Sequence, residues 1–268
     1  MSLSNRFGFI LFSPTGPEPP DLLSLPDGNA FAPSASSVIL VPAETYSFYL
    51  PFDVGLGLAS ANLDLVSDVS KAVVLGNIGS LTQINVGAGP KHYTATITIP
   101  ANVGTILEVY YRLQINLTNG LKLYSNRLWL KKSGFSSLSA VFSYRNRKPV
   151  GPIAYDLIEL DNFRNILRLK CVSNIPQTET ESEEYENITT GVKVTVETHT
   201  HVAIPIICPN TDALGHEGWR TLCAHKDILI NGRPFSIKTG YSEGEGMATL
   251  STGTFQVWET QFSVINRC

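Results

Sequence analysis

Eleven consecutive residues of this chain alternate between apolar and mostly polar side chains. From residue 107 to residue 117, every odd position is aliphatic or tyrosine, and the even positions between them are mostly polar. An α-helix would scatter such residues around its axis, whereas a β-strand gathers them on one face. The segment is therefore predicted to be a half-buried strand, and shorter alternating runs at 46–50 and 93–99 predict two more.

The pair Asn119-Gly120 follows this run and predicts a hairpin. A two-residue loop would set Leu117 opposite Lys122, whereas a three-residue loop with Gly120 in the left-handed region pairs Leu117 with Leu121. Only the longer loop keeps apolar side chains on the same face of both strands. We therefore predict the three-residue loop.

The chain is predicted to divide at residues 131–137, where the alternating pattern gives way to KKSGFSS. About seven strands with short turns are expected between residues 37 and 130, which is the spacing of an antiparallel sandwich. We expect an all-β protein with two antiparallel β-sandwich domains, the first of them immunoglobulin-like or fibronectin-III-like. The expected boundaries are 1–36 for an N-terminal strand and a proline-rich arm, 37–132 for the first sandwich and 138–268 for a C-terminal β-rich domain.

The C-terminal domain is expected to contain one short helix. Asn210, Thr211 or Asp212 can cap its first turn, and a partial apolar stripe continues to His225. Two glycines inside this segment lower its helix propensity by roughly 1 kcal/mol each. Strands are predicted near 138–144, 164–172, 191–204, 247–258 and 260–266, with a second hairpin centred on residues 231–232.

The proline-rich arm spans residues 14–35 and carries five prolines in its first thirteen positions. Proline cannot donate a hydrogen bond to a strand ladder, so an ordered loop or an extended arm is predicted. Its apolar side chains favour burial, because exposed apolar patches are rare on monomers. We expect the arm to pack across a neighbouring subunit, and a loop folded onto its own sandwich is the alternative.

Charge is concentrated in two segments. Residues 174–189 hold five glutamates and no lysine or arginine, so a solvated loop or a flexible excursion is predicted, with an acidic contact for a basic partner as the alternative. Residues 144–148 (YRNRK) fit either a solvated loop or a contact for nucleic acid or an acidic partner. Only 16% of all residues are charged and the formal net charge is −3. These values exclude a globally basic nucleic-acid binder and suggest surfaces buried against partners.

The weak candidates for metal ligands are His199 and His201, which alternate on one predicted strand and so share a face. The short Cys-x2-Cys or His-x3-His spacing of a zinc site is missing, so two exposed histidines are the favoured interpretation. No cofactor is expected. The four cysteines are widely spaced in a long chain, which predicts free thiols rather than disulfides. They are Cys171, Cys208, Cys223 and Cys268.

Motifs that would carry catalysis are missing. The sequence has no Gly-x-Ser-x-Gly, no Gly-x4-Gly-Lys-Ser and no His-Glu-x2-His, and the acidic residues at 156–161 fit a solvated turn. We therefore expect no catalytic residues and no enzymatic activity. The apolar run at 7–12 is too short for a signal peptide, and no run approaches the roughly 18 apolar residues of a membrane span. Synthesis in a cytoplasm is expected.

Three short motifs stand at 111–113 (Tyr-Arg-Leu), 124–126 (Tyr-Ser-Asn) and 144–146 (Tyr-Arg-Asn). The strand segment RNILRLKCVSNIP, a glutamate-rich stretch and the segment LCAHKDILINGRPF follow them. In this order the pieces, which lie between residues 104 and 240, resemble uncharacterised two-domain virion and tail-region structural proteins of bacteriophages infecting Bacteroidetes. In that group an aromatic-Arg-Leu strand precedes a turn and a Tyr-Ser-Asn motif, and a Tyr-Arg-Asn-like segment opens the second domain. The proline-rich arm has no counterpart in the group.

The resemblance implies a structural component of a phage virion, in the tail, baseplate or neck, with no catalytic residue to carry over. We expect self-association into a ring or sleeve, contacts with other virion structural proteins, and no membrane or specific nucleic acid as partner. The expected location is the virion, assembled in the host cytoplasm. The alternative is a carbohydrate- or receptor-binding module, supported by Tyr49, Tyr110, Trp129 and Trp258 as outward aromatics, and a glycoside-degrading tail enzyme comes third.

Overall fold

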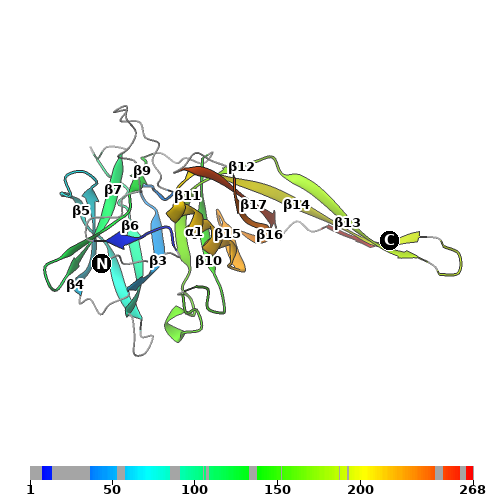
Figure 1. Ribbon diagram of the computed structural model, residues 1–268, viewed down its shortest axis with the longest axis horizontal. Helices are drawn as coiled ribbons and strands as arrows, with labels where there is room; N and C mark the ends of the chain where they lie inside the picture. The colour runs from blue at the N-terminus through cyan, green and yellow to red at the C-terminus, as the bar shows by residue number, and fades with distance from the viewer. Residues whose placement is uncertain are drawn as a thin grey trace.

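The computed structural model describes twelve stretches of the chain. They are residues 8–13, 37–52, 58–84, 91–104, 106, 109–132, 138–151, 153–186, 188–191, 193–244, 250–259 and 264–267. In these stretches the protein is all-β and sandwich-like, with a single α-helix (Figure 1). The expected all-β class with one short helix is confirmed. The proline-rich arm at 14–35 lies outside the described residues.

The first half of the chain forms a series of antiparallel neighbours. β3, β6, β5, β4 and β7 pair in that order, and β7 continues to β8 and β9. β1 extends β8, and β9 pairs with β2 in parallel. The strands are β1 (Phe12–Ser13), β2 (Ile39–Leu40), β3 (Thr45–Phe52), β4 (Leu58–Ser67), β5 (Val73–Ile84), β6 (Lys91–Thr98), β7 (Tyr110–Leu117), β8 (Lys122–Ser125) and β9 (Leu128–Leu130).

The second half forms a curved sheet against which the helix packs. β11, β10, β15, β16, β17 and β14 pair in that order, and β14 also pairs with β12, β13 and β18. The elements are β10 (Ser139–Arg145), the 3-10 turn η2 (Ile158–Leu160), β11 (Asn165–Lys170), β12 (Val172–Ser173), β13 (Gln177–Glu186), β14 (Lys193–Thr211), α1 (Ala213–Cys223), β15 (Asp227–Ile230), β16 (Arg233–Glu243), β17 (Ser251–Glu259) and β18 (Val264–Arg267).

The hairpin between β7 and β8 has the predicted register. Ile115 pairs with Leu123, and the backbone N–H of Leu117 donates to the carbonyl of Leu121 at 2.9 Å. Gly120 has φ +78°, which places it in the left-handed region of backbone conformation that residues other than glycine rarely adopt. The three-residue loop is therefore confirmed.

The two halves share strands and core. Ile166 of β11 pairs with Ser47 of β3, and Leu169 of β11 bridges to Val38. Buried side chains from both halves also belong to one continuous hydrophobic cluster. Strand pairing and one hydrophobic cluster thus connect residues before 131 with residues after 137. The expected division into two domains therefore stays a prediction.

The helix α1 begins where it was predicted and is anchored by its tryptophan. The carboxylate of Asp212 caps the helix by accepting from the N–H of Gly215 at 2.7 Å. Trp219 is fully buried, and its ring meets the rings of Phe9 and Phe142 edge-on, with 5.2 Å between centroids in each case. At Gly218 the helix lies directly against the Phe9 ring, which explains a glycine in mid-helix.

The prediction of a solvated loop at 174–189 is wrong. Residues 177–186 form β13, which pairs with β14 from Gln177 opposite Ala203 to Glu186 opposite Lys193. We call these paired segments, 177–186 and 193–203, the ribbon. Figure 1 shows it projecting from the body along the long axis of the molecule. The long partner strand decides this conformation, since β14 continues from the buried residues of the body and supplies a ladder for the acidic segment.

Candidate functional site

The ribbon is strongly acidic. It carries six glutamates and one lysine, so its formal net charge is −5. The register sets Glu183 opposite Glu197, and like charges directly opposite each other destabilise a strand pair. At the base of the ribbon Lys238 of β16 forms an ion pair with Glu179, and farther out the register sets Arg267 of β18 opposite Glu197. The ribbon therefore carries an excess of acidic over basic residues.

A second charged feature, which we call the basic surface, lies where the end of β10 meets the start of β15. It is a hollow of about 560 Å³ lined by Arg145, Asn146, Arg147, Lys148, Lys226 and Asp227. The antiparallel pairing of Arg145 with Asp227 brings its two segments together although they are some eighty residues apart in sequence. The side chains of Arg147, Lys148 and Lys226 are exposed. Three exposed cations and the half-buried Arg145 thus surround a single carboxylate in this hollow.

The Asp227 carboxylate is already neutralised by Arg164, which is not among the residues that line the basic surface. Arg164 holds Asp227 with two hydrogen bonds, of 2.7 Å to Oδ2 and 2.9 Å to Oδ1, and Arg145 lies 3.9 Å away. The Arg164 guanidinium is the main cause that lowers the pKa of Asp227 below its usual value. Asp227 therefore stays ionised and bound to Arg164, and the remaining cations of the basic surface are open to an external anion.

An adjoining hollow is electrically balanced. Arg145 and Arg147 line it together with Asp156 and Asp161, so two cations face two carboxylates there. These acidic side chains are exposed, as the sequence predicted for a solvated turn. An anionic partner is consequently attracted to the side of the basic surface that carries Lys148 and Lys226.

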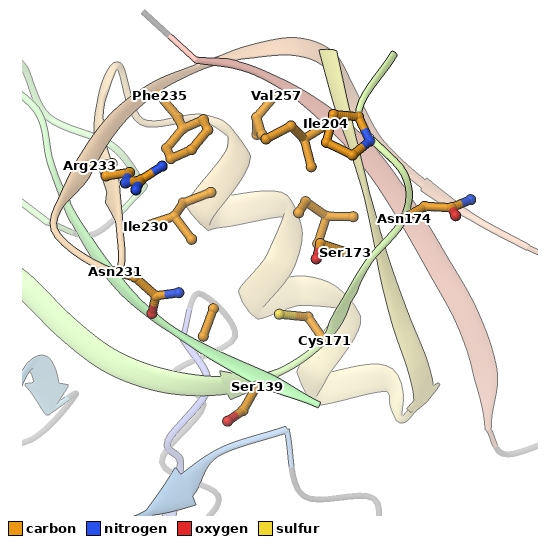
Figure 2. A pocket seen from close by; sticks show the side chains of 13 residues that line it. Ser139, Cys171, Ser173, Asn174, Ile204, Ile230, Asn231, Arg233, Phe235 and Val257 are labelled. Atoms are coloured by element: carbon orange, nitrogen blue, oxygen red, sulfur yellow. The ribbon is translucent and has the colours of Figure 1, made fainter. Parts of the chain in front are cut away.

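The cavity in Figure 2 has an apolar lining and a polar rim. It encloses about 470 Å³ beside α1, and Ile204, Ile230, Phe235, Val257 and the Cys171 thiol face into it. Its rim carries hydroxyl, amide and guanidinium groups from Ser139, Ser173, Asn174, Asn231 and Arg233. Such a cavity suits an apolar group with a polar end. Burial raises the pKa of Cys171 to about 12, so its thiol is not a nucleophile at neutral pH.

Ser251, His216 and Tyr241 form a hydrogen-bonded chain that resembles a nucleophile with its base. The hydroxyl of Ser251 lies 2.7 Å from Nε2 of His216, and Nδ1 of that ring lies 2.6 Å from the Tyr241 hydroxyl. None of these side chains lines either of the two hollows or the cavity of Figure 2. The contacts join α1 to β16 and β17, and a structural role accounts for them. No sequence signal pointed to this arrangement, because its members come from three separate elements.

A second buried network surrounds His225. Its Nε2 lies 2.9 Å from the Tyr155 hydroxyl and its Nδ1 2.7 Å from the carbonyl of Thr221, while Asn165 donates to Tyr155 at 2.7 Å. Burial lowers the pKa of His225 to about 4. The ring is therefore neutral at neutral pH, with Nδ1 donating to Thr221 and Nε2 accepting from Tyr155.

The two histidines proposed as weak metal ligands both lie on β14, within the ribbon. The register places His199 opposite Glu181 and His201 opposite Glu179. Their side chains lie outside what the structure describes, so a metal site at these positions stays a prediction. Among the described side chains no group of three or more His, Cys, Asp or Glu residues is arranged to hold a metal.

The aromatic residues predicted to face outward do not form an open platform. Tyr49 is buried, and its hydroxyl lies 2.6 Å from Nδ1 of His92, so its prediction as an outward aromatic is wrong. The connection between β10 and β11 covers that face of β3 with a small second cluster of buried residues. Trp129 and Trp258 are partly exposed, but Lys131 and Lys238 lie over their rings at 4.1 and 4.5 Å from the centroids.

The cysteines are free thiols wherever the structure describes them. Cys171 and Cys208 are buried and Cys223 is half-buried, and none is paired, as predicted. Cys268 lies outside the described residues. No helix in the described part of the chain is long and apolar enough to cross a membrane. No protein-family model matches this sequence, and a search of curated proteins found no match.

Proposed function

We propose that this protein is a structural component of a bacteriophage virion that acts by symmetric self-assembly. The observation that carries the proposal is the ribbon. β18 adds a third strand along residues 197–200, so the described outer end of the ribbon beyond them is two-stranded. A two-stranded ribbon in water is marginally stable by itself, and this one also sets Glu183 opposite Glu197. A projection of this kind becomes stable when it lies on another molecule, so its presence favours a protein that works in contact with neighbours.

Composition and sequence resemblance support the same proposal. Large permanent interfaces are depleted in charged residues. Only 16% of this chain is charged, and six of its glutamates lie in the ribbon, so charged residues are still rarer in the rest of the molecule. The resemblance to phage tail-region proteins supplies the virion setting. A position in the tail, baseplate or neck follows from that resemblance alone.

A second candidate is a carbohydrate- or receptor-binding module, which the cavity of Figure 2 favours. Sugar-binding surfaces usually offer an open aromatic face for stacking. Here Phe235 is the single aromatic residue among those lining the cavity, and lysine side chains lie over Trp129 and Trp258. A symmetric assembly therefore accounts for more of the molecule than a glycan site does.

The test measures the mass of the full-length protein in solution and images the same sample by electron microscopy. Light scattering during size exclusion, from about 1 to about 100 μM, covers the affinities expected of assembling subunits. Self-assembly predicts a mass that rises with concentration, and negative-stain images with rings or short tubes. A chain that stays monomeric throughout and binds a ligand on a glycan array would instead establish the second candidate.

A further inference from the structure

The ribbon and the basic surface are complementary in charge but lie on different parts of the molecule. The ribbon has a formal net charge of −5, and the basic surface offers Lys148 and Lys226 beside Arg145 and Arg147, which also face the adjoining hollow. Figure 1 shows the ribbon leading away from the body that carries the basic surface. The two features of one chain therefore do not meet in this structure.

We infer that the ribbon of one copy docks on the basic surface of a second copy. This inference rests on the proposed function and names the contact that carries the assembly. The glutamates of β13 would face Arg147, Lys148 and Lys226 of the neighbouring copy, all three of which are exposed. Cations next to the ribbon would also offset the repulsion between Glu183 and Glu197.

The geometry of such a contact determines the kind of assembly. Ribbon and basic surface are different patches, so the interface is heterologous: each copy gives its ribbon to one neighbour and receives the ribbon of another. Heterologous contacts close into rings when the rotation between copies allows it, and otherwise continue as helical tubes. β13 is ten residues long, so at about 3.3 Å per residue it reaches about 33 Å from its base.

Paired charge-reversal variants of the full chain test the inference. The first variant is Arg147→Glu with Lys148→Glu on the basic surface, and the second is Glu181→Lys with Glu183→Lys on the ribbon. Glu183→Lys replaces a like-charge cross-strand pair with an opposite-charge pair, so the ribbon should remain folded. The matched control is Lys122→Glu with Lys132→Glu, two exposed positions on the other half of the molecule. Thermal melting of each variant verifies that it folds.

The expected result is a loss of assembly in each variant and its recovery in their mixture. Each charge-reversed variant should raise the apparent dissociation constant about tenfold or more, and the control should not. An equimolar mixture should assemble again, because each variant then meets the opposite charge on the other. Raising the salt from about 50 to about 500 mM should weaken assembly of the unaltered chain, since screening acts on exposed charges.

Three outcomes would overturn the inference, and they can be told apart. If the unaltered chain assembles but the basic-surface variant does so equally well, or the mixture does not recover, the contact lies elsewhere while the proposed function stands. If the basic-surface variant loses only the binding of a labelled DNA oligonucleotide, the basic surface serves nucleic acid instead. If the unaltered chain stays monomeric at low salt, the proposed function fails together with the inference.

Discussion

Gly218→Ala should destabilise this protein, although alanine favours a helix more than glycine does. A Cβ atom at position 218 would lie 2.6 Å from Cδ1 of Phe9 and 2.8 Å from Cγ and Cε1 of the same ring. Phe9 is 2% exposed and packs edge-on against Trp219, so its ring cannot turn aside. Overpacking a core costs about 1–3 kcal/mol, whereas the gain in helix propensity is about 1 kcal/mol.

The net expectation is a free energy of unfolding lowered by up to about 2 kcal/mol, because the propensity gain of about 1 kcal/mol offsets only part of a clash of about 1–3 kcal/mol. Urea denaturation followed by circular dichroism measures this difference. Gly240→Ala is the matched control, since a Cβ there meets nothing within 4 Å. That variant should be within about 0.5 kcal/mol of the unaltered chain.

A double-mutant cycle isolates the contact itself. In a Phe9→Ala background the ring is gone, so Gly218→Ala should become neutral or stabilising by up to about 1 kcal/mol. A change of sign between the two backgrounds would establish that the Phe9 ring, and nothing else near the helix, requires a glycine. If Gly218→Ala stabilises the unaltered chain, the packing of α1 on the N-terminal segment is refuted.

Three further substitutions test other features. Gly120→Val should lower the free energy of unfolding by about 1 kcal/mol or more, because φ is +78° there, and an unchanged melting curve would contradict this turn. Asp68→Asn should cost about 3 kcal/mol in urea denaturation, since the carboxylate holds the fully buried Arg112 side chain, whereas the exposed control Asp156→Asn should be neutral. His225 has its pKa lowered to about 4, so the unfolded chain binds a proton below about pH 6.5 that the folded chain does not. The free energy of unfolding should therefore fall by up to about 3 kcal/mol between pH 6.5 and pH 4, and His225→Gln should remove that part of the pH dependence. If the urea midpoint changes with pH in the same way in both proteins, His225 is not the cause.

Local patterns determined the parts of the fold that depend on near neighbours in sequence. The alternation at 107–117 predicted β7, and the need to keep apolar side chains on one face predicted the register of its hairpin with β8. The capping residue and the apolar stripe likewise predicted α1, which begins after Asp212. In each case the residues that decide the structure lie within about one element of each other, so the sequence contains the information directly.

Tertiary structure decided the features on which the proposed function depends. β13 is polar on both faces and rich in glutamate, and its strand conformation comes from pairing with β14, whose inner end is held in the core by Ile206 and Cys208. The basic surface exists because β10 pairs with β15, which brings residues 145–148 beside Lys226. The sequence marked both segments as charged, but the hairpin with β14 made one of them a projecting ribbon, and the long-range pairing of β10 with β15 made the other a cationic hollow. Strand pairing can do this because a ladder joins backbones whatever their separation in sequence, while composition reports only the residues of each segment.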